Sequence, residues 1–81
     1  MKATLQDLAV GESGTVSGYV KGTSAYRGKL LAMGLTKGTS FTVERIAPMG
    51  DPVEIQVRGF SLSLRKNEAS ALLVERENHH E

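Results

Sequence analysis

The side chains that could bind a metal ion in this sequence are gathered near its C-terminal end. His79 and His80 are adjacent, and Glu81 follows them. Imidazole and carboxylate groups are common ligands of Fe²⁺ and Zn²⁺. Adjacent residues of an extended chain point to opposite sides, so the two imidazoles do not easily converge on one ion. We therefore expect no cofactor, and a weak or adventitious divalent-metal site in this tail is the alternative.

Catalysis by the chain itself would need a positioned nucleophile, base or metal ion. The sequence has no cysteine, no Gly-x-Ser-x-Gly motif and no phosphate-binding glycine loop. Its carboxylates, among them Asp51 and Glu68, have no spacing that forces a pair. We therefore expect that the protein is not an enzyme. An arginine could still act in trans on a partner that hydrolyses a nucleotide, and Arg27 is best placed because it flanks an apolar helical stripe.

Residues 24–34 have the apolar spacing of a short amphipathic helix. Apolar side chains recur at positions i, i+4 and i+7, and a fourth widens the stripe: Tyr26, Leu30, Met33 and Leu31. Gly34 stands where a left-handed residue ends a helix, and Leu35 can supply the apolar contact of that motif. One interpretation places the whole stripe in the core. The other leaves part of it exposed, so that it docks a partner together with Arg27.

Apolar residues that alternate with polar ones predict about five short strands. The stretches are 14–22, 39–47, 53–57, 60–65 and 71–77. Alternation places Phe41 and Phe60 on faces that point to the core. Ile46 is out of phase with Phe41, which indicates a bulge.

Glycine and proline residues mark the turns of the chain. Pro48 and Gly50 suit positions i+1 and i+3 of a type I turn. Arg58 and Gly59 suit a two-residue hairpin turn. Seven residues are therefore assigned to structural turns: Gly34, Gly38, Pro48, Gly50, Asp51, Pro52 and Gly59.

So small a sheet covers itself best by curling into a barrel. We predict a mainly β fold, a small SH3-like β-barrel of about five strands. A short helix is inserted after the first strand, and a helical turn precedes the last. The chain of 81 residues allows one domain, which we place at residues 1–76 with a flexible tail at residues 77–81.

Composition excludes several classes of partner. A net charge of +1 argues against nucleic acid, which usually binds a strongly basic domain. No apolar run approaches about 18 residues, so we expect membrane association only through a partner. Two tyrosines, two phenylalanines and no tryptophan are too few to line a groove for proline-rich peptides.

Four segments together resemble the FeoA family, the small accessory protein of bacterial ferrous-iron uptake. They are KLLAMGLTKG, APMGDP, EIQVRGFSLSLR and EASALLV, and the match runs from about Tyr26 to Val74. The resemblance implies an SH3-like barrel, a cytoplasmic location and a regulatory role through protein–protein interaction with FeoB. FeoB is a membrane transporter with a cytosolic GTP-binding domain. The expected partner is its cytosolic G-protein or its membrane region.

The same barrel resembles the C-terminal domain of iron-dependent repressors. The alternative function is therefore a metal-responsive domain that binds a divalent transition metal such as Fe²⁺. For the interaction with FeoB, the residues hypothesised to bind the partner are Tyr26, Arg27, Leu30, Leu31 and Met33. The sequence leaves open whether the chain forms a homo-oligomer.

Overall fold

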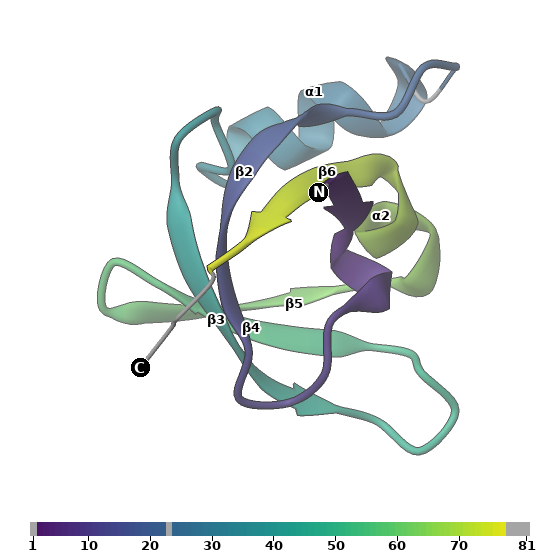
Figure 1. Ribbon diagram of the computed structural model, residues 1–81. Coiled ribbons are helices and arrows are strands. Elements are labelled where there is room, and N and C mark those ends of the chain that lie inside the picture. The colour runs from purple at the N-terminus through teal and green to yellow at the C-terminus, as the bar shows by residue number, and fades with distance from the viewer. Residues whose placement is uncertain (1, 23, 78–81) are drawn as a thin grey trace.

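The computed structural model in Figure 1 describes residues 2–22 and 24–77. Along the chain the elements are β1 (Lys2–Thr4), η1 (Leu5–Asp7), β2 (Ser13–Tyr19), α1 (Ser24–Ala32), β3 (Ser40–Ile46), β4 (Val53–Val57), β5 (Phe60–Leu64), α2 (Lys66–Ala71) and β6 (Leu72–Arg76). The strands form one antiparallel sheet in the order β1-β6-β2-β3-β4-β5. The sheet curls, and α2 packs against both edge strands, β1 and β5. This arrangement confirms the mainly β, SH3-like barrel.

The five strands expected from alternation are all present, and the described residues contain a sixth, β1. It has three residues, Lys2–Thr4, and pairs with β6. A strand this short offers no alternation to detect, so the sequence pattern missed it. The expected bulge in β3 is present, because its register with β4 shifts between Val43 and Arg45.

The apolar core lies inside the curled sheet and beneath the helices. Its buried members come from nearly every element: Leu5, Leu8, Val16, Leu30, Leu35, Phe41, Val43, Val53, Ile55, Val57, Leu64, Ala69, Ala71, Leu72 and Val74. Alternation predicts Phe60 on a core face, but 46% of it is exposed. It adjoins the two-residue turn at the end of the β4–β5 hairpin, beyond the packed interior. Alternation indicates which face a residue takes, but not how far along a hairpin the core extends.

α1 ends in the glycine motif expected from the sequence. Gly34 has a φ of 91°, a conformation that glycine adopts without strain. The N–H of Gly34 donates to the carbonyl of Leu31 at 3.0 Å, and the N–H of Leu35 donates to the carbonyl of Leu30 at 3.0 Å. This is the Schellman pattern, and it fixes where the chain leaves the helix.

The other turns lie where glycine and proline mark them. The N–H of Gly50 donates to the carbonyl of Ala47 at 2.7 Å, which closes a turn around Pro48. The N–H of Gly38 donates to the carbonyl of Val16 at 2.8 Å. This hydrogen bond holds the turn from which the chain enters β3. Pro52 directly precedes β4, and its carbonyl accepts the N–H of Ala47 at 3.1 Å. Gly59, with a φ of 89°, completes the β4–β5 turn.

Candidate partner-binding groove

The two sides of α1 have different surroundings, which divides the residues hypothesised to bind a partner. Leu30 has no exposed surface, and Tyr26 and Met33 are partly buried against the core. Arg27 is exposed, and 42% of Leu31 is exposed. The i, i+4, i+7 stripe is therefore the inner side of the helix. The accessible side carries Arg27 and Leu31, so Leu30 offers no surface to a partner in this structure.

A groove of about 750 Å³ lies between α1 and the neighbouring parts of β2 and β6. We call it the α1 groove, and it is open to solvent. It is lined by Ser17, Gly18, Tyr19, Val20, Lys21, Gly22, Ser24, Arg27, Leu31, Lys37 and Leu73. Arg27 and Leu31 of the hypothesised set thus border one concave surface. Tyr26, Leu30 and Met33 are not among the lining residues.

Tyr19 fixes the position of α1 over the sheet at the groove. Its hydroxyl donates to the carbonyl of Leu35, just after the helix, at 2.7 Å. The guanidinium carbon of Arg27 lies 5.4 Å from the centre of the Tyr19 ring, within the range of a cation–π contact. Through Tyr19, strand β2 therefore holds the C-terminal end of α1 by a hydrogen bond and orients Arg27 on the outer side of the helix.

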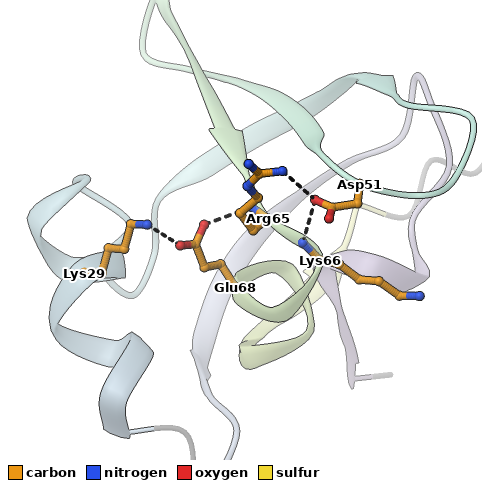
Figure 2. A network of polar contacts seen from close by, with 5 residues as sticks. All are labelled: Lys29, Asp51, Arg65, Lys66 and Glu68. Carbon is orange, nitrogen blue, oxygen red and sulfur yellow. Dashed lines mark hydrogen bonds and ion pairs between the residues drawn. The ribbon is translucent and has the colours of Figure 1, made fainter.

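A second set of contacts ties α1 to α2 (Figure 2). The buried carboxylate of Glu68 accepts a charged hydrogen bond from Lys29 of α1. It also accepts the backbone N–H of Arg65 at 2.9 Å. Asp51 accepts the N–H of Lys66 at 3.1 Å, and it lies 3.8 Å from the Arg65 guanidinium. Asp51 thus does more than form a turn, because it joins the β3–β4 loop to the start of α2.

Glu68 gives the fold a pH dependence of known sign. The hydrogen bond from Lys29 lowers the pKa of Glu68, helped by the Arg65 N–H, and these outweigh the raising effect of burial. A carboxyl whose pKa is lower in the folded state stabilises the fold above its unfolded pKa. That contribution disappears as the pH falls through the folded pKa. The free energy of unfolding should therefore decrease as the pH falls below the unfolded pKa of Glu68 and through its folded pKa.

Replacing Glu68 by glutamine should remove that dependence. At neutral pH we expect Glu68→Gln to lower the free energy of unfolding by about 1.5–3 kcal/mol, the range for hydrogen bonds to charged groups. Urea unfolding between pH 6 and pH 3 should show a shallower loss of stability in Glu68→Gln than in the unsubstituted chain. Lys29→Gln should flatten the same range, because Lys29 is the main cause of the shift. Parallel profiles for all three proteins would contradict this account.

The proposed metal ligands His79, His80 and Glu81 lie outside the described residues. Within residues 2–22 and 24–77, no three histidine or acidic side chains are grouped so that they could hold a metal ion. No helix in this described portion is long and apolar enough to cross a membrane.

The fold and the groove define a class of protein: a small SH3-like barrel with a basic and apolar groove beside an inserted helix. The FeoA domain model matches residues 3–76. The chain belongs to the FeoA family.

Known proteins similar to the chain agree with this assignment. A fusion protein of Porphyromonas gingivalis, Fe(2+) transport protein A/Fe(2+) transporter FeoB, is 32% identical over 71 residues, 88% of this chain. The chain spans only 8% of the length of that relative. A FeoA-like protein from Clostridium acetobutylicum has 41% identity and a TM-score of 0.85, covering 99% of this chain and 94% of its own.

The FeoA of Stenotrophomonas maltophilia, solved with zinc and described as a prokaryotic SH3 domain protein, has 26% identity and a TM-score of 0.75. The match covers 90% of this chain and 89% of that one. A manganese-dependent transcriptional repressor is similar at a TM-score of 0.85 but at 16% identity. That likeness shows the fold alone.

Proposed function

We propose that this chain is an accessory protein of ferrous-iron uptake that acts by binding the FeoB transporter. The observation that carries the proposal is the relative in which an FeoA-like segment and FeoB form one polypeptide. Joining two domains in one chain raises the effective concentration of one at the other, which benefits domains that work in contact. Binding of this kind needs no reaction at the chain itself.

The surface we assign to FeoB is the outer side of α1 with the α1 groove. Leu31 is a large apolar side chain with 42% exposure, and it lies beside the basic side chain of Arg27 in the groove lining. Arginine is enriched among the residues that dominate the binding energy of interfaces, and the exposed leucine beside it offers apolar area to bury. Tyr26 and Met33 lie on the inner side and contribute by holding the helix in place. The target we propose is the cytosolic GTP-binding portion of FeoB.

Leu31→Asp should weaken binding to this portion of FeoB. The substitution removes an apolar anchor and leaves a carboxylate to be desolvated, which together cost about 2 kcal/mol, or roughly 30-fold in Kd. Isothermal titration calorimetry measures the change. Met49→Asp is the matched control, because Met49 is 85% exposed and is not among the residues that line the groove. Undiminished binding by a folded Leu31→Asp variant would contradict the assignment.

The metal-responsive alternative has its candidate ligands, His79, His80 and Glu81, outside the described residues. Anoxic calorimetry with Fe²⁺ on the full chain and on a truncation after Asn78 tests it. We expect equal heats from the two proteins. Larger heats from the full chain would support a metal site at this end.

A further inference from the structure

Two sets of basic side chains among the described residues have different surroundings. Four form ion pairs with carboxylates: Lys29 with Glu68, Arg45 with Glu54, Arg65 with Asp51 and Arg76 with Glu12. Three others, Lys21, Arg27 and Lys37, line the α1 groove and have no ion pair with any described residue. Within the described chain, no carboxylate is among the residues that line this groove. The groove is therefore a concave surface of one charge sign.

Leucine side chains add apolar surface to this basic groove. Leu31 of α1 and Leu73 of β6 both line the groove. Gly18 lies close to Lys37 and Leu73: a Cβ placed on it would be 3.8 Å from Cε of Lys37 and 4.0 Å from Cδ1 of Leu73. With no side chain at this position, the groove keeps its depth beside Leu73. A ligand that fills it needs apolar groups for the walls and negative charge for the rim.

We propose that the α1 groove binds an acidic, amphipathic peptide segment of a partner protein. Its apolar side chains lie against Leu31 and Leu73, and its carboxylates pair with Lys21, Arg27 and Lys37. The inference rests on the proposed function in one respect, namely that this segment belongs to FeoB. Complementary charge of this kind speeds association and selects the partner.

Tyr19 favours a peptide over a single-stranded nucleic acid as the occupant. Nucleic-acid grooves combine cations with free aromatic faces on which bases stack. Here Arg27 lies over the ring of Tyr19, and the hydroxyl already donates to Leu35. Tyr19 is the single aromatic residue that lines the groove in the described part of the chain. The two leucine surfaces match aliphatic side chains better than bases.

A designed peptide tests the inference whatever the identity of the partner. The probe is a fluorescein-labelled helical peptide with leucines on one face and glutamates on its flanks, and its matched control has glutamine at every glutamate. Anisotropy titrations use the full chain, Lys21→Gln/Lys37→Gln, and the control variant Lys66→Gln. Lys66 is exposed, has no ion pair with a described residue and is not among the groove residues. The double variant leaves the contact between Arg27 and Tyr19 intact.

We expect the acidic peptide to bind more tightly than the glutamine peptide and to be released by salt. The double variant should bind it about fivefold more weakly, the loss expected for two solvent-exposed ion pairs, and Lys66→Gln should bind as the unsubstituted chain does. The inference would be overturned if the chain bound the acidic and glutamine peptides equally well. It would also be overturned if the double variant and Lys66→Gln bound the acidic peptide equally well. A single-stranded RNA that binds more tightly than the acidic peptide would overturn it as well. So would a dimer of the chain, seen by analytical ultracentrifugation, that the acidic peptide dissociates.

Competition with the cytosolic portion of FeoB separates the two proposals. If that portion displaces the acidic peptide, the groove and the partner are both supported. If the peptide binds as expected but FeoB does not displace it, the groove assignment is supported and FeoB is removed as its occupant. If FeoB binds equally well to the double variant and to Lys66→Gln, the interaction with FeoB stands, but FeoB uses a surface other than the groove.

Discussion

Leu30→Asp is expected to unfold the chain, whereas Leu31→Asp, one position later, is expected to leave it folded. Leu30 has no exposed surface, so the aspartate would bury an unpaired charge and leave a cavity. Truncating a buried leucine alone costs about 2–5 kcal/mol, and a buried charge adds several more. Small domains have a total stability of about 5–15 kcal/mol or less. Circular dichroism should show little or no cooperative melting for Leu30→Asp.

Leu31→Asp provides the matched comparison in the same helix. Leu31 is 42% exposed, so its new carboxylate reaches water, and we expect a loss of about 1 kcal/mol or less. Leu30→Met is a second control, because a hydrophobic substitution of similar volume costs less than about 1.5 kcal/mol. Equal destabilisation by the two aspartates would show that the helix does not present the sides described here.

Gly14→Ala should give the second largest effect. A Cβ on Gly14 would lie 2.5 Å from the backbone carbonyl oxygen of Glu75 and 3.2 Å from Cζ of Phe41. The carbonyl belongs to β6, which pairs with β2 and β1, so it cannot withdraw without disturbing both pairings. Overpacking of this kind typically costs about 1–3 kcal/mol, and the backbone contact places Gly14→Ala at the upper end. Urea unfolding measures the loss.

Gly18→Ala is the control on the same strand. Atoms nearest to its added Cβ are 3.8 and 4.0 Å away, which is ordinary van der Waals contact. We expect a change within about 0.5 kcal/mol. A similar loss in the two variants would mean that glycine is needed in β2 for conformation rather than for the close approach of β6.

The fold could be predicted because its signals are local. The end of α1 depends on Gly34 and Leu35, which are adjacent to it, and the β4–β5 hairpin depends on two residues between two alternating stretches. Gly14 shows where local patterns fail. The alternating stretch 14–22 includes it, but nothing in that stretch shows that its missing side chain makes room for the backbone of β6. Only the pairing of distant strands reveals that need for glycine.

The groove could be predicted only in part, for the same reason. The apolar spacing of α1 identifies the helix, but it does not show that Leu31 belongs to the outer side. Lys29 is close in sequence to Lys21 and Arg27, but it forms an ion pair with Glu68 of α2 and does not line the groove. Lys37, from the loop after the helix, takes the third basic position in the groove. Such groupings depend on how the helix docks on the sheet, which is set by contacts such as that of Tyr19 with Leu35.

The central claim is that the outer side of α1, with the groove beside it, is the surface that binds FeoB. The most direct test is an NMR titration of the isotope-labelled full chain with the cytosolic portion of FeoB. The account predicts that amide shifts change around Arg27, Leu31, Lys37 and Leu73 and stay constant around Met49. Changes confined to the β3–β4 turn or to the β4–β5 hairpin would contradict it.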